Sequence, residues 1–183
     1  MNRLILAALA LFLLTPPSAT AAELDLSKGT MQAGGTATFD IEMMMPDKGD
    51  STTGFLLDLA PSFGYFLIDR LELFAGLNFM MGFGDHYKNA AKNLGFSVGA
   101  KYFFPLGAVT LYAGLGVGMG FMLPDKGDTM KDLAIGVPLG VLLPFNEHVG
   151  LDLGTTVSYS MSLDDGPSSL NIPIGYLGVQ SFF

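Results

Sequence analysis

The sequence predicts an all-β fold: a transmembrane, eight-stranded, antiparallel up-and-down β-barrel. Three observations lead to it. Eight segments alternate between apolar and small or polar residues, their connections alternate between long and short, and the mean hydropathy of the 183-residue chain is +0.45. Successive side chains of a strand face opposite ways, so each segment presents one apolar face. With no second sheet to cover these faces, we expect lipid to cover them.

The eight expected strands are 30–44, 53–68, 71–83, 94–104, 109–121, 133–144, 149–161 and 169–183. The fifth contains LYAGLGVGMGFM, whose glycines at 114, 116, 118 and 120 also fit the G-x-x-x-G spacing of packed membrane helices. A helix would scatter these glycines around its circumference, whereas a strand places them on one face. We therefore expect a strand with its glycines inward, where bulky neighbours such as Phe74 and Phe103 fill the space or a groove remains.

The connections place long loops at one end of the barrel and short turns at the other. Polar segments such as PDKGDST and GDHYKNAAKN follow strands one, three, five and seven, while Asp69-Arg70, Leu106-Gly107-Ala108 and Phe145 to His148 follow strands two, four and six. This arrangement, with an even number of strands, is typical of outer-membrane barrels. A sheet can span hydrocarbon only by closing, because open edges leave backbone groups unpaired. A soluble β-sandwich is the alternative that this pattern disfavours.

The chain begins with features of a secretory signal peptide. The basic start MNR is followed by LILAALALFLL and a small-residue site near Ala22. The apolar run is shorter than the roughly 20 residues of a spanning helix, which disfavours a membrane anchor. We therefore divide the chain into a signal peptide, 1–22, and a barrel domain, 23–183.

Composition excludes several classes of function. The chain has no cysteine, so it has no disulfide, thiol nucleophile or lipidated N-terminal cysteine. Its formal net charge of −8 argues against nucleic acid as a partner, because such binding requires Lys and Arg to neutralise phosphates.

Two stretches resemble the small outer-membrane β-barrel family related to OmpA and OmpX. They are PSFGYFLIDRLELFAGLNF, 61–79, and the C-terminal GYLGVQSFF, whose final residue Phe183 alternates with Ser181, Val179 and Leu177. The resemblance implies a cell outer-membrane location in a Gram-negative-type envelope, and contact with outer-membrane lipid and lipopolysaccharide. It also implies recognition of Phe183 by the barrel-assembly machinery. We expect a monomer.

Two further patterns concern the strands and the loops. Pro61, Pro138 and Pro173 lie within expected strands, where proline cannot donate to the ladder, so we expect bulges there. PDKGD occurs at 46–50 and 124–128, through duplication of a half-barrel or through convergent turn chemistry. Six aspartates of the long-loop end are candidate cation ligands, although we favour solvated loop charges: Asp47, Asp50, Asp125, Asp128, Asp164 and Asp165.

The expected interior combines charged and bulky side chains. Its charged members are Asp40, Glu42, Asp58, Glu72, Lys101 and Asp152, and its bulky members are Leu56, Phe66, Phe74, Phe103, Tyr112 and Leu142. Because an unpaired buried charge is costly, we expect Lys101 to engage a lumenal carboxylate, with Arg70 near the short-turn end. Such an ion-pair plug is favoured over a path for protons or substrates, since eight strands leave room only for side chains.

No catalytic, cofactor-binding or metal-binding residue is assigned. His86 and His148 lie at opposite ends, and DHYKN around His86 lacks the H-x-S spacing of lipid A deacylases. The sequence therefore predicts a non-enzymatic barrel with a structural or surface-interaction role and a plugged lumen. The alternative is a lumenal binder or translocator of small hydrophobic molecules, which a lateral opening would favour. A lipid A-modifying enzyme ranks third.

Overall fold

The computed structural model describes residues 23–44, 52–84, 92–124, 128–164, 167–173 and 175–183. The expected signal peptide lies outside these ranges, as do His86 and the aspartates Asp47, Asp50, Asp125 and Asp165. Within them, no helix is long and apolar enough to cross a membrane.

The described chain is a succession of long antiparallel strands. They are β1 (Met31–Met44), β2 (Thr52–Ile68), β3 (Leu71–Gly84), β4 (Lys92–Pro105), β5 (Thr110–Leu123), β6 (Met130–Pro144), β7 (Val149–Ser162), β8 (Ser169–Asn171) and β9 (Tyr176–Phe182). The first seven agree with the expected segments to within three residues at each end. Strict alternation is the reason, because it persists until a turn residue interrupts it.

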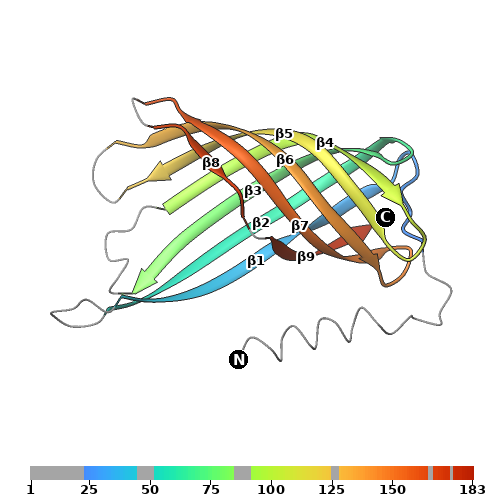
Figure 1. Ribbon diagram of the computed structural model, residues 1–183, viewed down its shortest axis with the longest axis horizontal. Coiled ribbons are helices and arrows are strands. Elements are labelled where there is room, and N and C mark those ends of the chain that lie inside the picture. The colour runs from blue at the N-terminus through green and yellow to red at the C-terminus, as the bar shows by residue number, and fades with distance from the viewer. Residues whose placement is uncertain (1–22, 45–51, 85–91, 125–127, 165–166, 174) are drawn as a thin grey trace.

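Each strand pairs with its neighbours in the chain, and β9 pairs with both β7 and β1, which closes the sheet into an eight-strand barrel (Figure 1). The closing ladder runs from Gln32 opposite Phe182 to Thr36 opposite Gly178. Beyond it, the backbones of Met31 and Phe183 exchange two hydrogen bonds of 2.7 and 2.9 Å. The C-terminal residue therefore takes part in closing the barrel.

The two faces of the wall carry the expected residues. Even-numbered side chains of β4, including Phe96, Val98 and Phe104, are exposed on the outside, whereas Phe103 is buried. In β6, Ile135, Val137 and Leu139 face outward, and Leu142 is buried in the interior. The apolar surface of the protein is thus on the outside of the barrel, and its buried core is in the lumen.

The expected last strand, 169–183, is broken into β8 and β9 around Pro173. Ser158 pairs with Asn171 in β8, but Gly154 pairs with Tyr176 in β9, so the C-terminal strand contains one extra residue. This confirms the bulge expected there, and the extra residue reverses which alternate side chains face inward.

The other two expected bulges are absent. Pro61 pairs with Gly35 and Pro138 with Thr156 in ladders that keep one register on both sides of each proline. Each proline thus removes a hydrogen-bond donor without inserting a residue. The second shift of register lies instead between Phe66 and Ile68.

Candidate functional site

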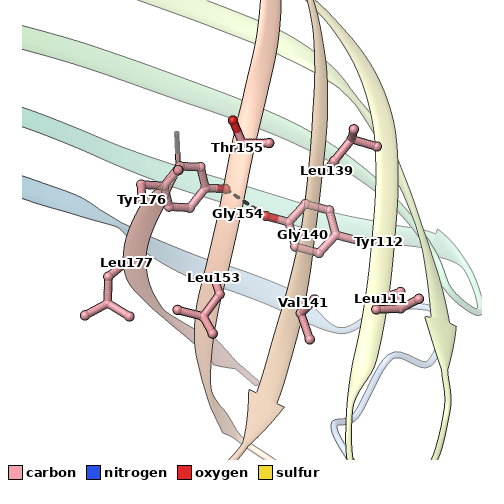
Figure 2. A pocket seen from close by; sticks show the side chains of 11 residues that line it. Leu111, Tyr112, Leu139, Gly140, Val141, Leu153, Gly154, Thr155, Tyr176 and Leu177 are labelled. Carbon is pink, nitrogen blue, oxygen red and sulfur yellow. Dashed lines mark hydrogen bonds between the residues drawn. The ribbon is translucent and has the colours of Figure 1, made fainter. Parts of the chain in front are cut away.

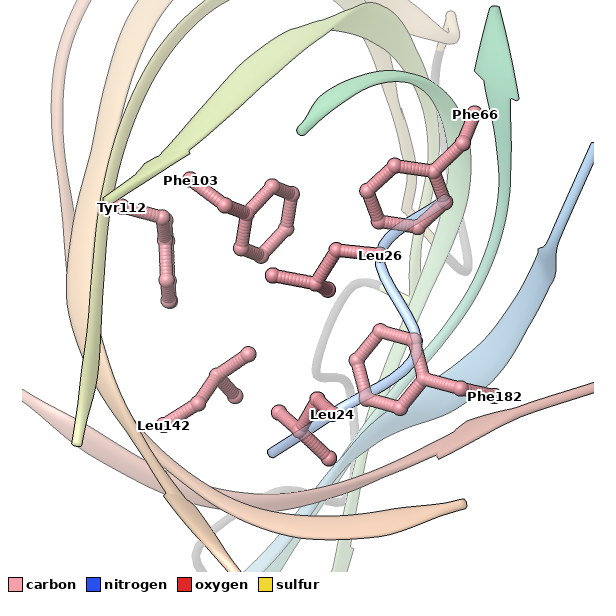
Figure 3. Close-up of a cluster of buried hydrophobic side chains, with 7 residues drawn as sticks. All are labelled: Leu24, Leu26, Phe66, Phe103, Tyr112, Leu142 and Phe182. Atoms are coloured by element: carbon pink, nitrogen blue, oxygen red, sulfur yellow. The ribbon is translucent and has the colours of Figure 1, made fainter. Parts of the chain in front are cut away.

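The lumen at the short-turn end is filled by an apolar cluster (Figure 3). Its members are Leu24, Leu26, Phe66, Phe103, Tyr112, Leu142 and Phe182, each no more than 6% exposed. The ring centroid of Phe66 lies 5.4 Å from that of Phe103 and 6.3 Å from that of Phe182, distances typical of favourable aromatic pairs. Two members, Leu24 and Leu26, come from the segment that precedes β1. This segment therefore enters the end of the barrel.

Backbone hydrogen bonds hold the N-terminal segment, residues 23–30, against the short turns. Asp25 N donates to Glu147 O at 3.0 Å, and Arg70 N donates to Leu26 O at 2.8 Å. Arg70, expected near this end, thus contributes its backbone, which adopts a left-handed φ of 69°. Anchoring on two separate turns fixes the leucines in the lumen.

An Asp25–Ser27 turn shapes this segment. The Ser27 hydroxyl and backbone N–H donate to Asp25 Oδ1 at 2.6 and 3.1 Å, and they lower the pKa of that carboxyl below its ordinary 3.8. Because the folded state favours the carboxylate, the turn contributes its stability above about pH 4 and loses it as pH falls through the lowered pKa.

A buried ion pair lies beside the apolar cluster. Lys101 Nζ lies 2.8 Å from Glu72 Oε2, and the two side chains are 11% and 0% exposed. The ammonium also lies 5.0 Å from the ring centroid of Phe74 and 5.5 Å from that of Tyr112. Ring faces attract cations, so these contacts add to the stabilisation of the buried charge. The predicted engagement of Lys101 with a lumenal carboxylate is confirmed, with Glu72 as the partner.

A second carboxylate, Asp152, is surrounded by hydrogen-bond donors. The Tyr112 hydroxyl donates to Oδ1 at 2.9 Å, Gln180 Nε2 donates to Oδ2 at 2.8 Å, and the Tyr176 hydroxyl lies 2.7 Å from that of Tyr112. Several donors stabilise a buried carboxylate without a cation.

The amide of Gln32 links Asp152 and its partners to the ion pair. It contacts the Gln180 side chain on one side and lies 2.7 Å from Glu72 Oε1 on the other, where its nitrogen donates in one of its two amide orientations. The polar groups therefore form one connected layer across the lumen. The space within this layer and beside the cluster is too small for a water molecule.

The glycine row of β5 is covered by neighbouring side chains. A methyl group at Gly116 would lie 3.1 Å from the Phe74 ring, and one at Gly120 would lie 2.4 Å from an Asp132 carboxylate oxygen. Phe74 therefore occupies the space as expected. Phe103 packs instead against Tyr112, with their ring centroids 5.6 Å apart.

Small polar side chains line the half of the lumen nearer the long loops. Asn78 Nδ2 donates to Asp58 Oδ1 at 2.7 Å, and the hydroxyls of Ser160 and Ser169 lie 2.7 Å apart. Asp132 is in the same half, at the beginning of β6. The two halves of the lumen thus differ: one is packed with buried apolar and paired groups, and the other carries hydrogen-bonded polar side chains such as Asp58, Asn78 and Ser160.

An apolar groove of about 730 Å³ crosses the outside of β5, β6, β7 and β9 (Figure 2). Aliphatic side chains border it, and Gly140 and Gly154 form its floor, with Tyr112 and Tyr176 behind them. The lining residues are Leu111, Tyr112, Leu139, Gly140, Val141, Leu153, Gly154, Thr155, Gly175, Tyr176 and Leu177. A methyl group on Gly140 or Gly154 would lie 2.4 Å from the Tyr112 hydroxyl oxygen, so these glycines leave room for the tyrosines on the lumenal side of the wall.

Several residues of the site were not anticipated from the sequence. Gln32 lies on the inward face of β1. Tyr176, Gln180 and Phe182 face inward in β9, where the bulge at Pro173 obscures the register in the sequence. Leu24 and Leu26 were not assigned to the core, although their i, i+2 spacing resembles that of the strands.

The remaining candidates lie apart from the lumen. His148 contacts Phe182 O and Glu147 at the short-turn end, and Asp164 accepts the Lys131 N–H at 2.7 Å near the long loops. Among the described residues, no three acidic or histidine side chains gather as a metal site would require.

Comparison with solved structures identifies the architecture. The N-terminal β-barrel domain of Pseudomonas aeruginosa OprF matches with a TM-score of 0.54 and 16% identity, over 85% of this chain and 98% of the other. Neisserial surface protein A matches with a TM-score of 0.54 and 19% identity, over 84% of this chain and 96% of the other.

The fold is that of a small eight-stranded outer-membrane β-barrel. No protein-family model matches the chain, and no curated protein matches its sequence. The closed eight-strand barrel and its match to these solved structures confirm the predicted fold class.

Proposed function

We propose that the chain is an outer-membrane β-barrel protein with a structural or surface-interaction role, whose lumen is closed at the short-turn end. The observation that carries this proposal is the filling of the lumen by the apolar cluster and by the connected polar layer beside it. Apolar side chains fill the mouth of the barrel, and the Glu72–Lys101 pair lies beside them with the hydrogen bonds of Asp152. A bulky, interlocked interior of this kind supports a rigid barrel more than a pore.

The free energy required to move an ion past these side chains supports closure of the lumen at the short-turn end. Moving an ion through the short-turn end would require it to pass Phe66, Phe182 and Leu142, whose side chains are almost fully buried. An ion stripped of water in such surroundings is strongly disfavoured unless polar groups replace its hydration shell. The polar groups beside the cluster are already engaged with one another, so they offer little such compensation.

We place the barrel in the outer membrane, with a signal peptide at 1–22 and a barrel domain at 23–183. The outward belt of Phe96, Val98, Leu115, Val117 and Leu177 supports contact with lipid. Lipopolysaccharide is the expected partner at the long-loop end. The barrel-assembly machinery is the expected partner of Phe183, whose side chain is 64% exposed. We propose a monomer without enzymatic activity.

Planar-bilayer conductance tests the closed lumen. We expect refolded wild-type protein to insert without steady open-channel currents. The double variant Leu24→Asp/Leu26→Asp brings water and charge into the apolar cluster, and it should conduct. Leu163→Asp, at an exposed position after β7, is the matched control and should remain silent. Steady currents from the wild type would overturn the closed-lumen proposal.

A further inference from the structure

The apolar groove on the outside of the barrel is a valley between two rows of larger side chains. One row consists of aliphatic residues that pair from β5 to β9: Leu111, Val141, Leu153 and Leu177 (Figure 2). The valley itself consists of the next outward residues, three of which are smaller than leucine: Ala113, Leu139, Thr155 and Gly175. Val137 and Val157 pair in the outward row beyond it. The groove is therefore one row of side chains wide.

The dimensions of the valley suit a single hydrocarbon chain. Outward residues recur at every second position of a strand, so the two bordering rows lie about 13 Å apart, and four strands spaced by about 4.8 Å make the valley about 14 Å long. Side chains of both rows occupy part of that width, which leaves too little room for an α-helix of about 10 Å diameter. The outside of a barrel is convex, so a second copy would touch the borders of the valley rather than its floor.

The polar groups around the valley are satisfied within the protein. The Thr155 hydroxyl donates to Pro173 O at 2.9 Å, which turns its oxygen toward the bend before β9. The hydroxyls of Tyr112 and Tyr176, behind the glycine floor, lie 2.7 Å apart on the lumenal side, where that of Tyr112 donates to Asp152. The groove therefore presents an apolar lining, which selects an apolar occupant.

Exposed aromatic residues at the short-turn end locate the beginning of the groove. Tyr102 and Phe104 are exposed on the outside of β4, with their ring centroids 4.9 Å apart, and Phe104 pairs with Leu111. Aromatic residues on the outside of a transmembrane barrel gather at the two interfaces between hydrocarbon and headgroups. Leu111 therefore lies at the interface on the short-turn side.

From this interface the groove slants into the hydrocarbon. Counted from the short turns, Leu111 is the second residue of β5, Leu153 is the fifth of β7, and Leu177 is the sixth from the end of β9. A strand tilted by about 40° rises about 2.5 Å per residue along the barrel axis, so the aliphatic row deepens by about 10 Å from β5 to β9. An acyl chain whose headgroup lies at the short-turn interface covers the same range of depth.

We propose that the groove is a binding site for one acyl chain of a phospholipid in the leaflet on the short-turn side. The headgroup lies near Leu111 and Phe104, and the chain crosses β6 and β7 toward Gly175. Both the groove and the bilayer are apolar, so the preference for the groove comes from dispersion contacts with its floor and its two borders. This inference rests on the proposed location of the barrel in the outer membrane, and it concerns a lipid that the barrel holds at one place.

Methyl NMR of the full chain, refolded in octyl glucoside micelles and titrated with dioleoyl phosphatidylcholine, tests the site. We expect saturable shifts of the Leu153 and Leu177 methyl groups. Leu73 is the control, because it is exposed outside the groove as the third residue of β3, and its shifts should not saturate. Glycerophosphocholine, which has the headgroup without the chains, should give no shift.

Two outcomes of this titration would overturn the proposal. The first is a folded barrel, migrating faster without boiling, that shows no saturable shift at Leu153. That result would leave the outer-membrane barrel standing and remove only the lipid site. The second is a set of shifts that follows protein concentration instead of lipid, because it would place a second copy over the groove.

Substitutions separate the valley from the rest of the apolar surface. Thr155→Phe fills the valley, and it should raise the lipid concentration for half-saturation at Leu153 by about tenfold. Val98→Phe adds the same ring to an exposed position of β4 outside the groove, and it should bind as the wild type does. Thr155→Val keeps the shape but lacks the hydroxyl that bonds Pro173, and it should also bind normally. Equal affinities of Thr155→Phe and Val98→Phe would contradict a chain seated in the valley.

Discussion

At the scale of single residues, glycine decides how closely the inner side chains approach the wall. A methyl group on Gly99 would lie 2.3 Å from Leu115 O and 2.7 Å from Phe74 Cε1. At Gly95, on the same strand and the same face, the nearest atoms would be 3.6 Å away. The two positions are therefore equivalent in sequence pattern but different in available space.

We predict that Gly99→Ala destabilises the barrel by about 1–3 kcal/mol, because the strand or the Phe74 ring must move. Gly95→Ala should be neutral or stabilising by up to about 1 kcal/mol, since alanine loses less backbone entropy on folding. Urea unfolding in lipid vesicles measures both free energies. Equal effects of the two substitutions would show that Phe74 does not occupy the space at Gly99.

The buried charges provide a second test at this scale. Lys101→Met leaves Glu72 uncompensated, and it should cost about 3–5 kcal/mol of unfolding free energy. Adding Glu72→Gln should recover much of that loss, because the remaining group is neutral and hydrogen-bonded. A double-mutant cycle in vesicles measures the coupling. If the losses of unfolding free energy from the two substitutions simply add, Lys101 and Glu72 do not stabilise each other.

At the scale of elements, β9 closes the barrel and also carries the proposed assembly signal. Deleting Phe183 removes both its backbone bonds to Met31 and its aromatic ring, whereas Phe183→Ala keeps the backbone. We expect both variants to lower the amount of barrel in the outer membrane if the ring is recognised during assembly. Fractionation and immunoblotting measure that amount, with Phe183→Tyr as the conservative control. A normal level of Phe183→Ala would show that only the backbone bonds matter.

The elements also show what could be predicted from the sequence. The strands from β1 to β7 were predictable because alternation of side chains directly reflects burial on two faces. The Lys101 pairing was predictable because a cation in the lumen needs a carboxylate. The inward positions of Tyr176, Gln180 and Phe182 were harder to assign, because one extra residue near Pro173 reverses the alternation. The point at which the β1–β9 ladder ends, at Thr36, depends on pairing across the whole sheet and could not be predicted from one segment.

At the scale of the whole molecule, the barrel combines a short-turn half packed with apolar side chains and a half toward the long loops that carries hydrogen-bonded polar side chains. The N-terminal segment supplies Leu24 and Leu26 to the packed half, so the chain before β1 contributes to the core. Closure of the sheet explains how an apolar outer surface and a polar backbone can coexist in lipid. The proposed function depends on this closed architecture.

Heat-dependent electrophoretic migration tests the closed barrel most directly. Outer-membrane fractions containing the protein are dissolved in SDS and run with and without boiling. Because the closed ladder from β1 through β9 must be broken before the chain unfolds, we predict a compact, faster-migrating form in the unheated sample and a slower form after boiling. A single band at the same position in both lanes, or absence of the protein from the outer-membrane fraction, would contradict a closed outer-membrane barrel.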